Sequence, residues 1–393
     1  MTTGGAAPRR PIYMDHNATT PVLPDVLEAM LPYFSDHFGN ASSGHRYGRD
    51  AAAAVEAARS DVAALIGAEP AEIVFTAGAT ESNNMALRGV APITGSRGAH
   101  IVTCAIEHEA VLETCHAMKE EGFEITVLPV DGEGLISPDD VRDALRDETV
   151  LVSVMLANNE IGTIQPVGEI GRIARRRGIL MHTDAVQAAG RVPTDVRDLS
   201  VDLMSLTAHK MYGPKGIGAL YIRSGVALRP LLAGGGQEGG QRSGTLNVPG
   251  IVGFGAAARA AMRDLEAESR RQASLRDRLW EGIKRRVPDV ALNGHPAKRL
   301  PNNLNVAIQH IEAEAMLTAL REVAAISSGS ACASGSSKGS YVIRALGSGE
   351  EAARCSLRFG LGRSNTEEEV DIVLEHLARQ AGRLREMQPK EVS

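Results

Sequence analysis

The sequence predicts an α/β protein built on a large, mostly parallel sheet, with a smaller α+β domain attached. Strand-like apolar runs alternate with amphipathic helical patterns between about residues 72 and 267. Such alternation is typical of a parallel sheet that helices cover on both faces. The chain has 393 residues, of which 43% are hydrophobic, so it is long enough for about two domains with separate cores.

The first part of the chain supplies the elements of the large domain in order. Residues 11–20 predict a short strand and a turn, and residues 49–66 an Ala-rich helix that stops at Gly67. Further strands are expected at 72–76, 100–103, 124–128, 150–155, 179–182, 203–206 and 218–222. Further helices are expected at 24–34, from near residue 80, and at 110–121, 138–145, 167–177 and 248–267.

A long charged helix is expected at 264–287, and we interpret it as the connection to the second domain. Strands are expected there at 304–308 and 356–359, followed by a closing helix at 366–385. Thr366 and Glu369 form a capping box at the start of this helix. Its apolar stripe, which we interpret as core packing, consists of Val370, Val373, Leu374, Leu377, Ala381 and Leu384. The predicted division is a large domain at 19–265 and a small domain made of 1–18 and 266–393.

Composition argues against several classes of protein. The net charge is −6 and no block of like charges is longer than Arg175–Arg177, so we expect no direct binding to nucleic acid. The N-terminus lacks the apolar core of a signal peptide, and no apolar run reaches 18 residues, so we expect no membrane span. Four widely spaced cysteines indicate reduced thiols in a cytoplasmic protein and predict no metal site.

Two side chains with complementary chemistry follow neighbouring apolar runs. Asp184 follows the run 178–181 and Lys210 follows the run 201–206, and a parallel sheet binds ligands at the carboxyl ends of its strands. An amine and a carboxylate in one crevice suit pyridoxal phosphate: the amine bonds the aldehyde, and the carboxylate keeps the ring nitrogen protonated. An Asp and a Lys at this spacing are common, so the remaining motifs have to support the site.

Several motifs could hold a phosphate. The predicted strand 72–76 turns into a helix at Ala79 and Thr80, whose free N–H groups would form an anion site, although many such turns hold no ligand. Thr207 and His209 precede Lys210 and could bind the same phosphate, and Thr245 adds a hydroxyl from a glycine-rich loop.

Three further side chains lie near predicted strand ends. His108 could stack on a cofactor ring and move protons, although a lone histidine is more often structural. Asn159 could donate to a carboxylate or to the cofactor, or could be an ordinary turn residue. Gln187 follows Asp184 by three positions, within reach of the same cofactor edge.

The small domain contributes a thiol and a guanidinium. Cys332 lies among Ser, Ala and Gly residues in the stretch 327–340, which cannot bury it well, and an exposed thiol on a loop suits a nucleophile that serves two sites. A buried packing role is the alternative for Cys332. Arg358, on a predicted strand, suits a substrate carboxylate, or else an ordinary ion pair.

The ordered set of motifs resembles the cysteine desulfurases, the NifS/IscS-like group of the class V aminotransferase family. The stretches that carry the resemblance are MDHNATTPV (14–22), EIVFTAGATESNN (72–84), EHEAVLETC (107–115), ANNEIGTIQP (157–166), HTDAVQAAG (182–190), LTAHKMYGPKGIGALY (206–221), RSGTLNVP (242–249), SSGSACASGS (327–336) and LRFGLGR (357–363). They span nearly the whole chain. The resemblance implies an aspartate aminotransferase-like fold (PLP fold type I) and pyridoxal 5'-phosphate as cofactor.

The resemblance also implies roles. Lys210 should bind the cofactor covalently, Asp184 should pair with its ring nitrogen, Gln187 should contact its ring oxygen, and His108 should stack on the ring and shuttle protons. Ala79, Thr80, Thr207 and His209 should hold the phosphate, and Thr245 should reach the phosphate of a neighbouring subunit, which implies a homodimer. Asn159 and Arg358 should bind the carboxylate of L-cysteine, and Cys332 should take the sulfur as a persulfide and leave L-alanine.

The sequence leaves some alternatives open. A pyridoxal aminotransferase or a selenocysteine lyase of the same fold would share most of these motifs, and an aminotransferase would not need Cys332. A non-catalytic scaffold predicts the loss of Lys210, Asp184 or Cys332, and all three are present. The acceptor protein for the sulfur is not identified, since iron–sulfur cluster assembly, tRNA or DNA thiolation and other thio-cofactor pathways all fit. Cys355, close to Arg358, has no expected role.

Overall fold

The structure is a computed structural model that describes residues 10–90, 99–328 and 339–387. It confirms the predicted α/β class. Among these residues, a seven-stranded sheet forms the centre of the larger part, and β8 runs antiparallel to the other six strands. The strand order is β2 (Ile73–Thr76), β8 (Gly218–Ile222), β7 (Leu203–Thr207), β6 (Leu180–Asp184), β5 (Thr149–Ser153), β3 (His100–Cys104) and β4 (Glu124–Leu128).

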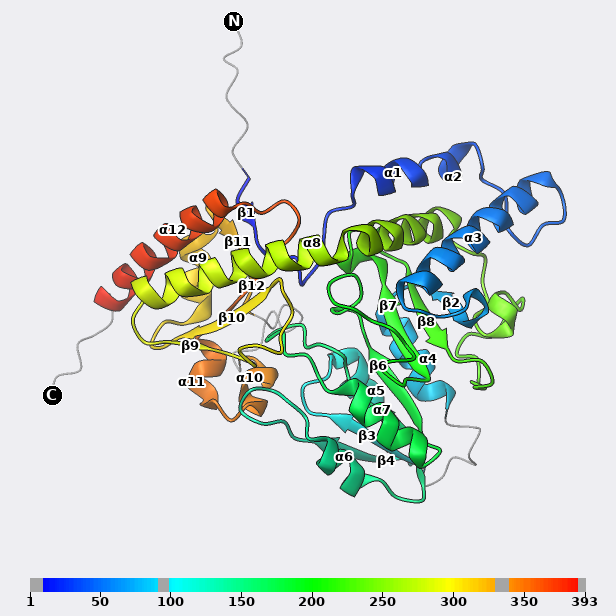
Figure 1. Ribbon diagram of the computed structural model, residues 1–393, viewed down its shortest axis with the longest axis horizontal. Coiled ribbons are helices and arrows are strands. Elements are labelled where there is room, and N and C mark those ends of the chain that lie inside the picture. Colours follow the sequence, from blue (N-terminus) through cyan, green and yellow to red (C-terminus); the bar gives the residue numbers. More distant parts are fainter. Residues whose placement is uncertain (1–9, 91–98, 329–338, 388–393) are drawn as a thin grey trace, which may run out of the picture.

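Helices cover both faces of this sheet, as the alternating pattern predicts (Figure 1). Along β5, Leu151 belongs to one apolar cluster and Val152 to another, because successive side chains of a strand point to opposite faces. One cluster includes residues of α1 (Pro24–Met30), α3 (Arg46–Leu65), α6 (Pro138–Ala144), α7 (Val167–Arg176) and α8 (Val248–Arg286). The other includes α4 (Ala79–Gly89) and α5 (Glu109–Glu120).

Three predicted helices are divided or joined differently in the structure. The helix expected at 24–34 is split into α1 and α2 (Pro32–Ser35), because Pro32 has no N–H to continue the hydrogen-bond ladder. The segments expected at 248–267 and 264–287 are instead one continuous helix of 39 residues, α8. Figure 1 shows α8 running from the large sheet to the smaller part of the molecule.

A third apolar cluster forms the core of the smaller part. It gathers Met14, residues of the C-terminal half of α8 and buried residues between 287 and 381. The proposed division into domains places Val342, Ile343, Leu346 and Ala353 in the small domain, and they belong to the first cluster. That division itself stays a prediction. The closing helix α12 (Glu367–Glu386) has the predicted capping box, and five of its six stripe residues are buried, with Leu384 packed at the edge.

The smaller part contains two small sheets. One has the order β12 (Ser356–Gly360), β10 (Asn303–Ile308) and β9 (Val290–Leu292), and the other pairs β1 (Ile12–Tyr13) with β11 (Ala324–Ala325). The sequence did not predict β9, β11, α9 (Ala313–Leu320), α10 (Tyr341–Ala345) or α11 (Gly349–Arg354). The described part of the chain contains no helix with the length and hydrophobicity that a membrane crossing requires.

Candidate active site

A cavity of about 790 Å³ lies at the edge of the large sheet where β6 and β7 end. Ten of the predicted site residues line it: Ala79, Thr80, His108, Asn159, Asp184, Gln187, Thr207, His209, Lys210 and Arg358. They come from segments that follow parallel strands, and from β12 of the smaller part. The sheet topology thus brings together residues that lie up to 279 positions apart, from Ala79 to Arg358.

Asp184 is the last residue of β6, and its side chain is buried in this cavity wall. Asn83 of α4 donates to Asp184 Oδ2 over 2.8 Å, and the N–H of Val186 donates to Oδ1 over 3.0 Å. Both carboxylate oxygens therefore have a fixed donor, which holds the group in one orientation.

Lys210 follows β7 in a short 3₁₀ turn, Ala208–Lys210. Its Nζ donates to the carbonyl oxygens of Asn17 at 2.5 Å and Ala18 at 2.6 Å. Burial lowers the pKa of the Lys210 amine to about 7, the cations of Arg358 and Arg191 act in the same direction, and Asp15 and Asp184 oppose them. Near neutral pH a substantial fraction of this amine carries a free lone pair, as a nucleophile requires.

Gln187 has a fixed side-chain orientation. Its Oε1 accepts from Asn17 Nδ2 and from Arg191 Nη1, both at 3.1 Å, and its Nε2 donates to the carbonyl of Asn17 at 2.9 Å. Because Nε2 carries two hydrogens, one of them remains for a ligand in the cavity. Arg191 is itself buried and donates to the carbonyls of His16, Gln187 and Lys210, so it ties the N-terminal turn to the lysine.

The helix α4 begins at Ala79, where the sequence predicts an anion site, and its first residues line the cavity. Gly78 precedes the helix at a φ of 156°, and Ala79 and Thr80 begin it with N–H groups that have no acceptor within the helix. His209 lies across the cavity, and its Nδ1 is 3.1 Å from Thr19 Oγ1. Burial lowers the pKa of His209 to about 4, with the help of neighbouring cations, so the ring is neutral and can offer one N–H.

The hydroxyl of Thr207 already has a hydrogen-bond acceptor within the protein. It is buried at the end of β7, and its hydroxyl donates to the carbonyl of Ile217 over 3.1 Å. In this arrangement its single proton is already used, so a phosphate would have to replace the carbonyl as acceptor.

His108 caps the N-terminus of α5. The N–H of Ala110 donates to His108 Nδ1 over 3.1 Å, so in the neutral ring the proton sits on Nε2. Its neighbour Glu107 is fully buried, and burial raises the pKa of this carboxyl well above its usual value. Glu107 Oε1 accepts from the N–H of Met155 at 2.5 Å.

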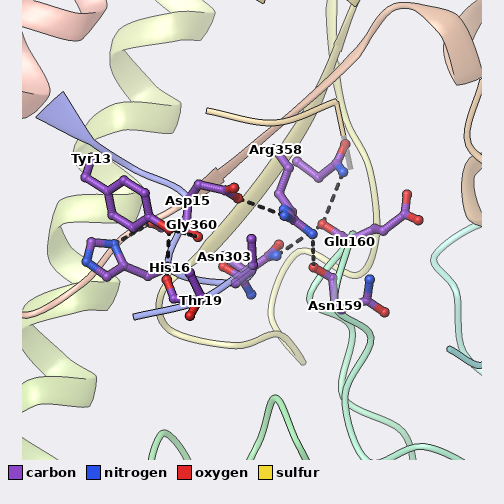
Figure 2. A network of polar contacts seen from close by, with 12 residues as sticks. Tyr13, Asp15, His16, Thr19, Asn159, Glu160, Asn303, Arg358 and Gly360 are labelled. Atoms are coloured by element: carbon purple, nitrogen blue, oxygen red, sulfur yellow. Dashed lines mark hydrogen bonds and ion pairs between the residues drawn. The ribbon is translucent and has the colours of Figure 1, made fainter. Parts of the chain in front are cut away.

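Arg358 and Asn159 both line the cavity, and Figure 2 shows them side by side. Arg358 Nη1 donates to the carbonyl of Asn159 over 3.1 Å, and Nη2 pairs with Asp15 Oδ1 at 2.8 Å. The side chain of Arg358 is only 2% exposed. Asn159 Oδ1 is buried and has no hydrogen-bond partner among the described residues, so it can accept from an N–H or O–H group of a ligand.

Two predicted residues are not placed in this cavity. Thr245 is exposed and does not line it. Cys332 lies outside the described residues. The chain on both sides of the segment 329–338 is anchored beside the cavity: Ser327 pairs with Arg358 backbone to backbone, and Tyr341 donates to the carbonyl of Glu107 at 2.5 Å.

The three cysteines that the structure describes are buried. Burial raises the pKa of Cys104 and of Cys115 to about 12, and it also raises the pKa of Cys355. These thiols are therefore packed small residues with little thiolate at neutral pH. Across residues 10–90, 99–328 and 339–387, no group of His, Cys, Asp and Glu side chains is suited to hold a metal ion.

Sequence reasoning missed several residues that hold the predicted ones, including four that line the cavity. Asn17, Ala18 and Thr19 of the N-terminal turn contact Gln187, Lys210 and His209, and Asn83 holds Asp184. Asn83 follows Thr80 by one helical turn, so its spacing could have placed it on the cavity face of α4. No local signal marks the contacts of residues 17–19.

Comparison with known proteins agrees with this geometry. Residues 12–373 match the model of the Aminotransferase class-V family. "Cysteine desulfurase IscS" of Anaeromyxobacter sp. (strain Fw109-5) is 54% identical over 382 residues, which cover 96% of this chain and 94% of that protein. A solved structure named "NIFS-LIKE PROTEIN" superposes with a TM-score of 0.88 at 39% identity, covering 94% of this chain and 98% of that one.

A second solved structure, "SspA in complex with cysteine", has a TM-score of 0.80 at 39% identity, with 89% of this chain and 98% of that chain covered. The family model covers far more than half of the chain, and the identities extend over nearly its full length. The chain therefore belongs to the class V aminotransferase family and, within it, to the cysteine desulfurases.

Proposed function

We propose that this chain is a cysteine desulfurase, which converts L-cysteine into L-alanine and passes the sulfur through a persulfide on Cys332. The observation that carries this proposal is the convergence of Asp184, Lys210 and Arg358 on one cavity. Together they supply the ring-nitrogen partner, the amine and the carboxylate receptor that a pyridoxal enzyme acting on an amino acid needs. The similarity to cysteine desulfurases over almost the whole chain favours this activity over an aminotransferase or a selenocysteine lyase.

The family depends on pyridoxal 5'-phosphate, and the residues present fit it. The cavity provides an ordered carboxylate, unpaired helix N–H groups and a partly neutral amine, each suited to a different part of this molecule. When bound, the cofactor supplies a protonated ring that accepts the electron pair released as substrate bonds break.

Each part of the cofactor has residues in the cavity that would hold it. Asp184 would hold the ring nitrogen, and the remaining hydrogen of Gln187 Nε2 would donate to the ring oxygen. The residues that would hold the phosphate are Ala79, Thr80, Thr207 and His209. Lys210 Nζ would take the aldehyde, and with a pKa of about 7 it can both accept and return a proton at the reacting carbon.

L-cysteine would be oriented by its carboxylate. Arg358 offers a fixed guanidinium at the cavity wall, and the Asn159 side chain beside it can donate to the second carboxylate oxygen. His108 lies on the same rim with its proton on Nε2, where it can pass a proton to or from the substrate thiol.

The sulfur step requires the thiolate of Cys332 to attack the sulfur of the substrate. A sulfur–sulfur bond forms as the carbon–sulfur bond breaks, and the carbon that loses sulfur gains a proton and becomes the methyl group of alanine. Cys332 follows Ser327, which pairs with Arg358, by five positions, and a chain of this length can reach about 17 Å. The cavity therefore lies within reach of Cys332.

We further propose that the enzyme is a homodimer in which Thr245 reaches the phosphate of the second subunit. Thr245 is exposed, which a contact with another chain requires. A group of large apolar side chains on and after α1 and α2 is also exposed and could be covered by the second copy. It consists of Leu27, Leu31, Phe34, Phe38 and Tyr47. The acceptor protein for the sulfur and the cytoplasmic location remain predictions.

Activity on L-cysteine tests this function. The purified enzyme, supplied with L-cysteine and a thiol reductant, should release sulfide and L-alanine in equal amounts, and Cys332→Ala should release neither. Release by both proteins would remove Cys332 from the mechanism. If neither protein releases product although the cofactor is bound, an aminotransferase or selenocysteine lyase activity would replace the proposed desulfurase activity.

A further inference from the structure

The N-terminal motif at residues 14–22 has no role in the proposed chemistry, yet the structure places it against the cavity. Asn17, Ala18 and Thr19 line the cavity wall. Asp15, at the start of the same turn, does not line the cavity, but it lies against Arg358, which does. Figure 2 shows Asp15 beside the guanidinium, with Asn159 next to the same group.

The pair between Asp15 and Arg358 is preformed by the backbone. The segment of Asp15 pairs with Gly360, two residues after Arg358, and the N–H of His16 donates to the carbonyl of Gly360 over 3.0 Å. The carbonyl of Asp15 accepts from the N–H of Ala18 at 2.9 Å. Both partners of the ion pair are therefore fixed by paired segments, and the side chains need little ordering to meet.

Asp15 is also the carboxylate best placed to balance Arg358. Glu160 lies on the neighbouring turn, but burial raises the pKa of its carboxyl, and its Oε2 accepts from Ser340 at 2.5 Å. Asp15 is less buried, with 19% of its side chain exposed, and it is directly paired with Arg358 Nη2.

We propose that Asp15 is a positioning residue that sets the charge balance of the substrate-carboxylate site. Its carboxylate pairs with Arg358, so a bound amino acid shares the guanidinium with a negative charge that is already there. Asp15 thus orients Arg358 and weakens its attraction for amino-acid carboxylates, which favours release of the product L-alanine. This inference rests on the proposed function, because it takes Arg358 as the receptor for the substrate carboxylate.

Replacement of Asp15 by asparagine separates charge from geometry. The amide of the Asp15→Asn variant would still offer an oxygen to Arg358 Nη2, but without the negative charge. L-Alanine should then bind about five-fold more tightly, because a like charge near the binding carboxylate is removed. A residue that only supported the fold would have the opposite effect, since its loss would loosen the site.

A second readout comes from the Lys210 nitrogen. The charged groups that face it are Arg358, Arg191, Asp15 and Asp184, and Asp15 is one of the two that stabilise its protonated form. In Asp15→Asn, the pH midpoint of the visible absorbance of the bound cofactor should move lower by about half a pH unit.

The experiment compares holoenzymes of the wild type, Asp15→Asn, Asp15→Glu and Asp264→Asn. L-Alanine is titrated against the cofactor absorbance, and the pH midpoint is measured in the same samples. Asp15→Glu should keep values near those of the wild type. Asp264→Asn removes the carboxylate that pairs with Arg363 outside the cavity, so it should change neither readout.

Tighter L-alanine binding and a lower midpoint in Asp15→Asn alone would support the proposal. Unchanged or weaker binding would overturn it. If Asp15→Asn does not fold, Asp15→Ser gives the same test with a smaller neutral acceptor. Failure of the wild type to release L-alanine and sulfide from L-cysteine would instead overturn the proposed function, so the two failures can be told apart.

Discussion

The side chain of Asn83 donates to Asp184 Oδ2 over 2.8 Å, and this contact links the helix that begins at the anion site to the carboxylate at the end of β6. Both side chains are buried, and Asp184 has one other donor, the N–H of Val186. One helix, α4, therefore contributes to two parts of the cavity, since its first residues, Ala79 and Thr80, line the cavity and Asn83 in its second turn orients Asp184.

Asn83→Ala should weaken cofactor binding about tenfold, because a hydrogen bond to a charged group contributes about 1.5–3 kcal/mol. The affinity can be measured from the absorbance of the bound cofactor. The matched control is Asn293→Ala, which removes a buried amide with two side-chain bonds, to Asn305 and Ser356, in the small sheet. Both variants should lose stability. If Asn293→Ala lowers cofactor affinity as much as Asn83→Ala does, the effect comes from unfolding and not from Asp184.

The elements that the sequence predicts well are those with clear local signals. The strands 124–128 and 218–222 have the observed bounds, because runs rich in strand-forming residues lie between turns at both ends, although only 218–222 is buried along its whole length. The missed helices α9, α10 and α11 have five to eight residues, too few turns to show a helical period. Pro32 itself could have predicted the break in the helix. The prediction of one helix over 24–34 was wrong because it relied on the apolar positions and not on this proline.

The candidate site likewise has features that the sequence predicts and features that it does not. Asp184 and Lys210 follow strands that were predicted, so their meeting at one sheet edge could be inferred from topology. The contacts that hold the site residues in place could not be inferred in this way. Lys210 bonds to Asn17 across 193 residues and Arg358 pairs with Asp15 across 343 residues, and only the packed tertiary structure brings such distant segments together.

The depressed pKa of Lys210 predicts a pH-dependent stability of the cofactor-free protein. The folded chain releases the proton near pH 7, whereas the unfolded chain keeps it to about pH 10.4, so the unfolded state binds more protons between these values. The free energy of unfolding of the wild type should therefore rise relative to that of Lys210→Met between about pH 7 and pH 10, by up to about 1 kcal/mol per pH unit.

Urea unfolding at several pH values between about 6 and 9.5 measures this difference. Lys284→Met is the control, because Lys284 lies near the end of α8, where it pairs with the exposed Glu281, and should show no such trend. Parallel stability curves for the wild type and Lys210→Met would contradict the depressed pKa.

Arg358→Ala should raise the KM for L-cysteine by about thirtyfold or more, because a charge-assisted contact to the substrate carboxylate is lost. Cofactor affinity should change much less, since the residues assigned to the cofactor lie on other segments. Arg363→Ala removes a comparable ion pair with Asp264 outside the cavity and should leave KM unchanged. An equal loss of substrate and cofactor binding in Arg358→Ala would mark this arginine as structural.

Ser340 links the C-terminal flank of the Cys332 segment to the turn that carries Asn159. Its hydroxyl donates to Glu160 Oε2 at 2.5 Å and also caps α10 by accepting from the N–H of Ile343 at 3.2 Å. Ser340→Ala should cost about 1–2 kcal/mol of stability, because a helix cap and a bond to a buried carboxyl are both lost. It should also slow persulfide formation on Cys332 about three- to tenfold, because the segment loses one of its anchors.

Persulfide formation can be followed by mass spectrometry in a single turnover with L-cysteine, with cofactor absorbance recorded in the same sample. Ser137→Ala is the matched control, since Ser137 caps α6 by accepting from the N–H of Asp140 at 3.2 Å and does not line the cavity. It should lose the stability that a helix cap contributes, about 1 kcal/mol, without slower persulfide formation. Equal rates in the two variants would show that the bond between Ser340 and Glu160 supports only the local fold, whereas a slow Ser340→Ala with unchanged cofactor absorbance would place this bond in the delivery of the thiol.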